Sequence, residues 1–202
     1  DFLELKLKYK KGRLLIGNPP FGDRMNLATK FMKKGFQIAD YIAFILPISQ
    51  KDNNYKFYEF DLVYSEDLGL QEYTDREIHC CFNIYKRPTN GKLNKRKQYE
   101  FEDFALFEQV KSKDTKRNKP YKDNNYDFRI CTWGASCGRI LKDNESYAKE
   151  VAFYIHNPNI KDRVRIAIED MDIKKDFYMT STPNLLLWQI CEYLIKNIPD
   201  LK

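Results

Sequence analysis

The first half of the chain alternates continuous apolar runs with a segment of helical spacing. Residues 13–17 (RLLIG) and 41–46 (YIAFIL) are short apolar runs, which are typical of strands buried in a parallel sheet. Between them, residues 26–38 place apolar side chains at helical intervals, and Asn26 is a suitable N-cap. A strand, a helix and a second strand within about 35 residues predict a βαβ crossover unit.

Two further runs predict an antiparallel pair. Residues 60–64 (FDLVY) have the composition of a short strand, and residues 78–86 (IHCCFNIYK) that of a longer one. The sequence Pro-Thr-Asn-Gly at 88–91 then gives a strong turn signal. We therefore expect a mixed α/β sheet in the first ninety residues.

The pattern changes in the second half of the chain. Residues 92–127 are rich in Lys, Asn and Tyr and predict a flexible or extended loop. Residues 128–132, 151–156 and 164–168 have the pattern of strands, and residues 185–198 that of an apolar helix. This second half therefore predicts a mixed α+β region.

The net charge of +6 is unevenly distributed. Residues 1–90 carry 14 Lys and Arg against 12 Asp and Glu, and residues 91–150 carry 14 against 10. In residues 151–202 the two signs balance, at seven each. The basic excess is thus concentrated in the middle of the chain, which permits a nucleic-acid partner without requiring one. The change in composition places a domain boundary near residue 91.

The five cysteines do not predict a disulfide framework. Their number is odd, and Cys80 and Cys81 are adjacent. The chain also lacks a CxxC pair and has two histidines, which disfavours a zinc site. Reduced thiols fit a cytoplasmic protein, and because no apolar run reaches membrane-spanning length we expect no membrane association.

The stretch after the first apolar run carries the candidate chemistry. Asn18-Pro19-Pro20-Phe21 ends that run, because proline has no N–H to donate to a strand ladder. The four residues can be an ordinary turn with Phe21 in the core. They can also be a rigid polar and aromatic site, since ligands of open α/β sheets bind beyond the carboxyl ends of the strands.

The tetrapeptide resembles the (D/N/S)PP(Y/F) motif of S-adenosylmethionine-dependent amino methyltransferases. Within that group the chain is most similar to the adenine-N6 DNA methyltransferases. The sequence FILPIS at 44–49 and the two later strand candidates also resemble that family, and the resemblance covers about residues 12–90.

The resemblance implies a role for each residue of the motif. Asn18 and the carbonyl of Pro19 would accept hydrogen bonds from an exocyclic amino group, and Pro19 and Pro20 would stiffen the turn. Phe21 would stack on the face of an extruded base. A second aromatic residue would stack on the other face, and the candidates are Phe82 and Tyr85, which lie on opposite faces of their strand.

The resemblance also implies S-adenosyl-L-methionine as cofactor, yet the expected donor-binding residues are missing. The family binds its methyl donor through a glycine-containing loop after the first strand and an acidic residue after the second, and neither precedes residue 14. We expect the chain to be the carboxyl-terminal part of a longer enzyme, an interpretation that its start at Asp1 favours. The alternative is a permuted order in which residues 133–138 (WGASCG) form the donor loop.

Residues 91–202 correspond by position to the target-recognition region of the resembled family. Lysine and arginine side chains suit contacts with phosphates, and Trp133 and Arg139 are further candidate contacts. The predicted DNA-binding residues are Lys92, Lys95, Arg96, Lys97, Lys111, Lys113, Lys116, Arg117, Lys119 and Lys122.

Together these features predict an α/β fold. Residues 1–90 would form the second half of a Rossmann-like methyltransferase sheet, and residues 91–202 a mixed α+β target-recognition region. The expected function is methylation of adenine N6 in double-stranded DNA with base flipping, as part of a restriction–modification system, with the missing amino-terminal part of the same enzyme as a partner. Two alternatives stay open: a methyltransferase acting on RNA or on a protein glutamine amide, and a non-catalytic DNA-binding or specificity module.

Overall fold

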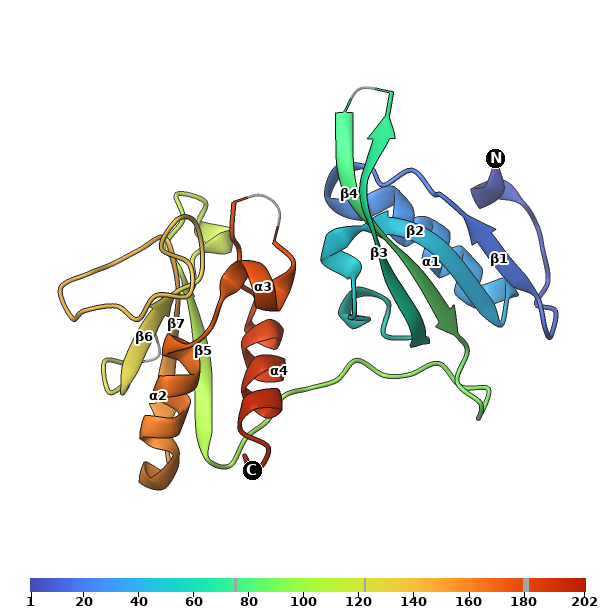
Figure 1. Cartoon of the computed structure of the whole chain (residues 1–202). Coiled ribbons are helices and arrows are strands. Elements are labelled where there is room, and N and C mark those ends of the chain that lie inside the picture. Colours follow the sequence, from blue (N-terminus) through green and yellow to red (C-terminus); the bar gives the residue numbers. More distant parts are fainter. Residues whose placement is uncertain (75, 122, 180–181) are drawn as a thin grey trace. The chain divides into compact units, whose positions relative to one another are not determined.

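The computed structural model describes residues 1–74, 76–121, 123–179 and 182–202, and divides into two compact units. The first unit spans Asp1–Lys97 and the second spans Gln98–Lys202 (Figure 1). Each unit has its own sheet and its own buried side chains, so each is described by itself.

The described residues of the first unit form a four-stranded mixed sheet with one α-helix. Its strands have the order β1-β2-β4-β3, with β1 and β2 parallel and the other neighbours antiparallel. The α/β class, the βαβ unit and the antiparallel pair predicted from the sequence are therefore confirmed. The elements are β1 (Leu14–Gly17), α1 (Asn26–Ile38), β2 (Tyr41–Pro47), β3 (Asp61–Tyr73) and β4 (Arg76–Lys86), with short 3-10 helices at Phe2–Glu4, Asp23–Met25, Ile48–Gln50 and Tyr55–Phe57.

Helix α1 packs closely on one face of the two parallel strands. A Cβ atom on Gly35 would lie 2.6 Å from Cδ1 of Ile42 and 3.0 Å from Cδ2 of Leu15, so glycine permits this approach. The helix occupies the residues that the spacing predicts, but Asn26 is its first residue and not its N-cap. The N-cap is Met25, which is in the left-handed conformation and provides no side-chain hydrogen bond to the helix.

The prediction that residues 13–17 form a buried strand is right about the strand and wrong about its burial. The strand exists and is parallel to β2, but among the described residues it pairs with β2 alone and is an edge strand. Leu14 is 54% exposed and Ile16 is 67% exposed, because α1 covers the face that carries Leu15 and leaves the opposite face open. An apolar run therefore predicts the strand here, but not its burial.

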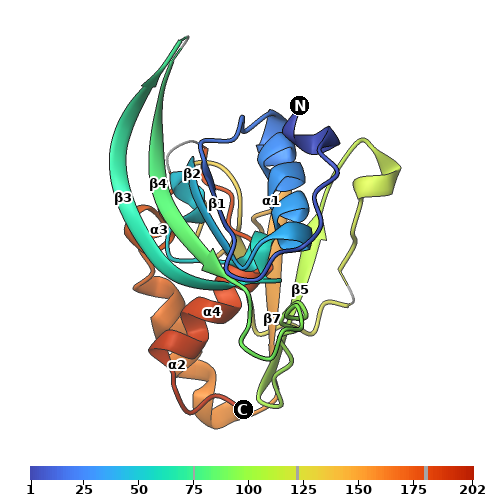
Figure 2. The same cartoon turned by 90° about the vertical axis from the view of Figure 1, so that its right-hand side faces the viewer.

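Strand β3 is much longer than the five residues predicted at 60–64. It runs to Tyr73 because it pairs with β4 along its whole length, through register shifts between Leu62 and Tyr64 and between Asp67 and Gly69. Such irregularities break the period of two that reveals a strand in a sequence. Figure 2 shows the two strands as a curved ribbon that extends beyond the rest of the sheet.

In the part of the second unit that the structure describes, a three-stranded antiparallel sheet packs with three α-helices. The strand order is β5-β7-β6, so β7 is central. This arrangement agrees with the mixed α+β pattern predicted for the second half. The elements are β5 (Phe104–Val110), β6 (Phe128–Cys131), β7 (Lys149–Ile155), α2 (Lys161–Glu169), α3 (Ile173–Phe177) and α4 (Leu187–Asn197), with 3-10 helices at Thr115–Arg117 and Pro158–Ile160.

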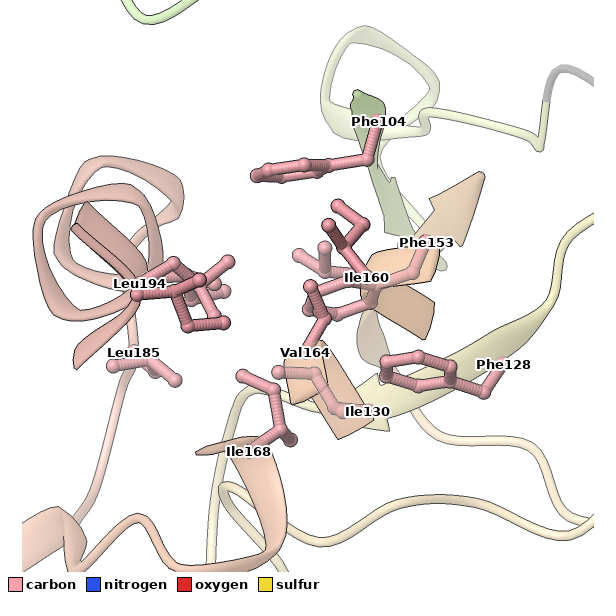
Figure 3. Close-up of a cluster of buried hydrophobic side chains, with 12 residues drawn as sticks. Phe104, Phe128, Ile130, Phe153, Ile160, Val164, Ile168, Leu185 and Leu194 are labelled. Carbon is pink, nitrogen blue, oxygen red and sulfur yellow. The ribbon is translucent and has the colours of Figure 1, made fainter. Parts of the chain in front are cut away.

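The core of the second unit lies between one face of this sheet and helices α2 and α4. The rings of Phe128 and Phe153 stack with their centroids 4.4 Å apart, and Val164 of α2 and Leu194 of α4 are fully buried in the same cluster (Figure 3). Burial of this apolar surface is the main stabilising contribution to the unit.

Two predictions for the second half are wrong. Residues 164–168, predicted as a strand, lie in helix α2, which buries Val164 and Ile168 and leaves Ile166 55% exposed. The period-two pattern of these three residues coincided with one turn of a helix. The segment 92–127, predicted as a loop, contains β5, which is held by its pairing with the central strand β7.

The opposite face of this sheet carries a buried ion pair. Nη1 of Arg129 lies 3.0 Å from Oε2 of Glu150, and the two side chains are 5% and 0% exposed. Nη2 of Arg129 also donates to the carbonyls of Lys142 and Glu145, and its guanidinium stacks on Tyr126. The pair therefore fixes the long segment between β6 and β7 against the sheet.

Candidate active site beyond the parallel strands

The Asn-Pro-Pro-Phe turn lies directly after β1, at the carboxyl edge of the parallel pair. The carbonyl oxygen of Phe21 accepts hydrogen bonds from the backbone N–H groups of Leu27 at 3.1 Å and Ala28 at 3.4 Å. The first turn of α1 thus anchors the end of the motif. Pro19 is buried and Asn18 is exposed, so the turn is fixed to the protein while its amide side chain faces outward.

The connection from this turn to α1 is conformationally strained. Gly22 has φ +69°, and a Cβ atom there would lie 2.9 Å from Cγ of Leu27. Arg24 and Met25 also have positive φ, at 49° and 64°, which non-glycine residues seldom adopt. Nζ of Lys56 donates to the carbonyl of Arg24 at 2.8 Å and so ties this segment to the connection between β2 and β3. Strained backbone of this kind clusters at functional sites.

Tyr73 joins the motif from the end of β3. Its hydroxyl donates to Oδ1 of Asn18 at 3.3 Å and lies 3.7 Å from Sγ of Cys80. Its ring centroid is 5.7 Å from that of Phe21, with the planes inclined by 60°. Burial raises the pKa of Tyr73 and the pKa of Cys80, so the phenol and the thiol are both protonated near neutral pH.

The cluster formed by Asn18, Phe21 and Tyr73 combines two kinds of recognition. The amide oxygen of Asn18 is a hydrogen-bond acceptor, and the Pro19 carbonyl oxygen accepts no hydrogen bond from the described residues. The two aromatic rings provide flat apolar surface beside these oxygens. This combination suits a planar ligand that carries an amino group.

The two predicted stacking residues of β4 have other ring partners in the unit. Tyr85 is fully buried, its ring packs edge-on against Phe57, and its hydroxyl accepts from Nδ2 of Asn83 at 2.9 Å. The ring of Phe82 contacts that of Tyr64 at 6.3 Å. Neither forms a hydrogen bond or ring contact with Asn18 or Phe21.

Sequence reasoning missed Tyr73, which the structure does bring to the motif. Tyr73 is 55 residues from Asn18 and nine residues beyond the strand predicted at 60–64. Residues 70–73 are Leu-Gln-Glu-Tyr and do not alternate between polar and apolar, so no local signal extended the predicted strand towards the motif.

The predicted basic residues divide between the two units. Lys92, Lys95, Arg96 and Lys97 belong to the first unit, where Arg96 stacks between Tyr55 and Tyr58 with its guanidinium carbon 4.9 Å and 5.0 Å from the ring centroids. The second unit carries Lys111, Lys113, Lys116, Arg117 and Lys119, all exposed.

Some of these charges have acidic partners within the second unit. Lys119 pairs with Glu108 at 2.8 Å, and Arg117 pairs with Asp114 at 3.4 Å. Lys113 and Lys116 are exposed in the same segment. Lys122 lies outside the described residues.

The loop at 133–138 is a packed turn of the second unit and does not fit a donor-binding loop. Gly138 donates to the carbonyl of Cys131, and a Cβ atom on Gly138 would lie 2.9 Å from two carbons of Ile173. The glycine therefore allows close packing against α3. Arg139 pairs with Glu145, and Trp133 is 52% exposed.

Membrane-spanning and metal-binding features are absent from the described residues. No helix in the part of the chain that the structure describes combines the length and apolar character needed to cross a membrane. In those same residues, no three His, Cys, Asp or Glu side chains are grouped so that they could hold a metal ion.

Comparisons with known proteins give one distant structural match. No protein-family model matches the chain, and no curated protein matches it. A crystal structure from Pyrococcus horikoshii, provisionally described as an RNA methyltransferase, aligns with a TM-score of 0.35 and 20% identity. The alignment covers 43% of this chain and 47% of that one, so it spans about half the length of the neighbour. Similarity at this level carries no functional argument, so a function must be inferred from the cluster of Asn18, Phe21 and Tyr73 itself.

Proposed function

We propose that this chain carries the amine-binding site of a methyltransferase that modifies the N6 amino group of adenine in double-stranded DNA. The observation that carries the proposal is the cluster of Asn18, Phe21 and Tyr73 directly beyond β1. The resemblance of the Asn-Pro-Pro-Phe turn to the amino methyltransferases gives the reaction class.

The chemistry explains why an amide and a carbonyl are needed. The lone pair of an exocyclic amino group is delocalised into its ring, so the nitrogen is a poor nucleophile. Two acceptors on its hydrogens, the Asn18 amide oxygen and the Pro19 carbonyl, draw the nitrogen towards a tetrahedral shape and aim its lone pair. Because the turn is rigid and anchored to α1, the acceptors are already in place, and their energetic contribution is made in the transition state.

The topology of the first unit supports the placement of this site. β1 and β2 are parallel and their carboxyl ends lie side by side, with the motif in the loop that leads to α1. In open α/β sheets this edge is where ligands bind. An adenine reaches such a loop only after it leaves the duplex stack, so the proposal includes base flipping.

A polyanionic partner is supported by the exposed basic segment of the second unit. Lys111, Lys113 and Lys116 lie within six residues and are all exposed. Contacts of this kind with phosphates contribute affinity that falls steeply as salt is raised. The choice of DNA over RNA follows from the family resemblance.

The methyl group would come from S-adenosylmethionine, and we place its binding residues on a separate segment of the enzyme. Among the described residues β1 pairs with β2 alone, so its other edge is the place where we expect a further strand to pair. A strand paired there in parallel with β1 would bring its own carboxyl end next to Asn18.

The test is methyl transfer by the intact gene product. Labelled donor is supplied with DNA, RNA or protein, and we expect label on DNA, at adenine N6. Asn18→Ala should reduce the rate by about 10²-fold or more, because it removes one acceptor from the transition state. Asn26→Ala, which alters an exposed asparagine eight residues away at the start of α1, should retain activity.

Three outcomes would contradict the proposal. Label on RNA alone or on protein alone would mean that the enzyme acts on a different class of substrate. Unchanged activity of Asn18→Ala would remove the site assignment. Absence of transfer to any of the three substrates would favour the non-catalytic alternative.

A further inference from the structure

Tyr73 lies on a part of the sheet that has no support from β2. Strand β4 pairs with β2 from Cys80 to Lys86, whereas residues 76–79 pair with β3 alone. Residues 70–73 and 76–79 therefore form a two-stranded extension, which we call the Tyr73 arm (Figure 2). A ribbon of two strands has little intrinsic stability, so the arm can move relative to the four-stranded part.

The base of the Tyr73 arm has the features of a hinge. The register of β3 shifts between Asp67 and Gly69, and Gly69 has φ +68° with open space around it. Oδ1 of Asp67 accepts from the backbone N–H of Gly69 at 2.8 Å and lies 2.6 Å from Nε2 of His79. These polar contacts define where the arm begins, and the bulge gives it a point of bending.

The far end of the arm contacts the amine-binding site through a long hydrogen bond to Asn18 and through the ring contact with Phe21. The distance of 3.3 Å between the Tyr73 hydroxyl and Oδ1 of Asn18 is long for an O–H···O hydrogen bond, whose usual length is about 2.7–2.8 Å. The hydroxyl is also within reach of Sγ of Cys80 at 3.7 Å, so it has an alternative neighbour when it leaves Asn18.

We propose that Tyr73 is a positioning residue that occupies the amine site in the absence of ligand. Its hydroxyl takes the place of a substrate amino group on Asn18 and is displaced when that group arrives. The inference rests on the proposed function, because it assigns the same Asn18 oxygen to the substrate.

The aromatic rings couple this displacement to base entry. A planar ring held between two others needs ~7 Å between their planes, since carbon atoms in contact are about 3.5 Å apart. The centroids of Phe21 and Tyr73 are 5.7 Å apart, so a base can enter between them only if Tyr73 moves away. That movement also breaks the bond between its hydroxyl and Asn18.

The Asn18 oxygen that the displacement uncovers makes the site selective for ligands with an amino group. Adenine replaces the lost hydrogen bond with its own amino group. Purine without the 6-amino group fills the same space but leaves the Asn18 oxygen unpaired. Leaving a polar group without its partner is an effective means of rejecting a ligand of similar shape.

The test uses short thymidine-only single strands that carry one central adenine or, in its place, one unsubstituted purine. A single strand removes the cost of base flipping from the measurement. Fluorescence anisotropy with the full chain gives both affinities. Tyr73→Phe keeps the ring and removes the hydroxyl, so both affinities should rise about fivefold, the value of one hydrogen bond, while their ratio stays the same.

Two control variants test whether the rise in affinity depends on the hydrogen bond between Tyr73 and Asn18. In an Asn18→Ala background, Tyr73→Phe should change neither affinity, because the bond is already absent. Tyr64→Phe removes another hydroxyl of β3, one that bonds Glu66 at 2.9 Å, and should have no effect. Unchanged or weaker adenine binding by Tyr73→Phe, or a gain that persists without Asn18, would overturn the proposal.

A ligand-free measurement separates this proposal from the proposed function. The Cζ resonance of isotope-labelled Tyr73 should shift in Asn18→Ala, because its hydrogen-bond partner is removed, and an unchanged resonance would overturn the inference. Equal affinity of the unsubstituted protein for the two strands would instead contradict the amine site itself.

Discussion

The two units of this chain bury their sheets to very different extents. In the second unit, β7 lies between two strands, and Val151 and Phe153 are 1% and 0% exposed beneath α2 and α4. In the first unit, strand β1 has no charged residue, yet Leu14 and Ile16 are more than half exposed. What covers each face of a strand decides its burial: α2 and α4 cover the face of β7 that carries Val151 and Phe153, whereas α1 covers only the face of β1 that carries Leu15.

The polar groups of the two units differ in the same way. Arg129 and Glu150 are almost completely buried and make several hydrogen bonds, which fixes their geometry. Asn18 is exposed and has one long hydrogen bond to Tyr73. The first arrangement is suited to holding a segment in place, and the second to exchanging one partner for another.

The largest expected effect breaks the buried ion pair. Arg129→Met leaves Glu150 without its cation in a buried position and should lower the free energy of unfolding of the second unit by about 3–5 kcal/mol. Both tryptophans of the chain, Trp133 and Trp188, belong to that unit, so tryptophan fluorescence during urea denaturation reports on it.

A double variant is the control for this prediction. Arg129→Met combined with Glu150→Leu should recover much of the lost free energy, because no unpaired charge is then buried. A loss below about 1 kcal/mol in the single variant would mean that the pair is hydrated and that its role in fixing the segment is smaller than the structure indicates.

The prediction of intermediate size compares two isoleucine substitutions, one at a buried position of β2 and one at an exposed position of β1. Ile42 of β2 is fully buried, and Ile42→Ala should lower the free energy of unfolding of the first unit by about 2–5 kcal/mol. Ile16 of β1 is 67% exposed, and Ile16→Ala should change the free energy of unfolding of the first unit by no more than about 0.5 kcal/mol. Hydrogen exchange of the β2 amides measures both. Equal losses would show that the β1 face is covered in solution.

The smallest expected effect is a pH dependence confined to the first unit. Oδ2 of Asp40 accepts from the backbone N–H of Gly12, and Oδ1 accepts from the hydroxyl of Tyr9 and lies near Arg87. The Gly12 hydrogen bond, the Tyr9 hydroxyl and Arg87 together lower the pKa of Asp40. Its contribution to stability is therefore complete above the ordinary carboxyl pKa of about 3.9 and is lost as the pH falls through the lowered value.

Hydrogen exchange near Gly12 should accelerate over that acidic range, and Asp40→Asn should show fast exchange that does not vary there. Tryptophan fluorescence, which reports on the second unit, should show no difference between the two proteins. If hydrogen exchange near Gly12 still accelerated with acid in Asp40→Asn, the pH dependence would belong to a carboxylate other than Asp40.

Local patterns predicted many elements well. Residues 26–38 predicted α1 to the residue, since spacing over a few turns is enough to reveal an amphipathic helix. Residues 164–168 misled because Val164, Ile166 and Ile168 fit both a strand and a helix, and only packing against the sheet selects the helix that buries the first and the last. Strand β5 was missed because its pairing partner β7 begins 39 residues after β5 ends.

The sequence by itself determined the rigid turn of Asn18, Pro19, Pro20 and Phe21 at the end of a strand, because proline geometry and a short apolar run act locally. The tertiary structure alone decided that Tyr73 reaches Asn18, that Tyr85 is buried, and that β1 is an open edge. Each of these depends on strand order and on the register shifts of a long hairpin. Such pairings join residues far apart in the chain, and no pattern within a single segment specifies them.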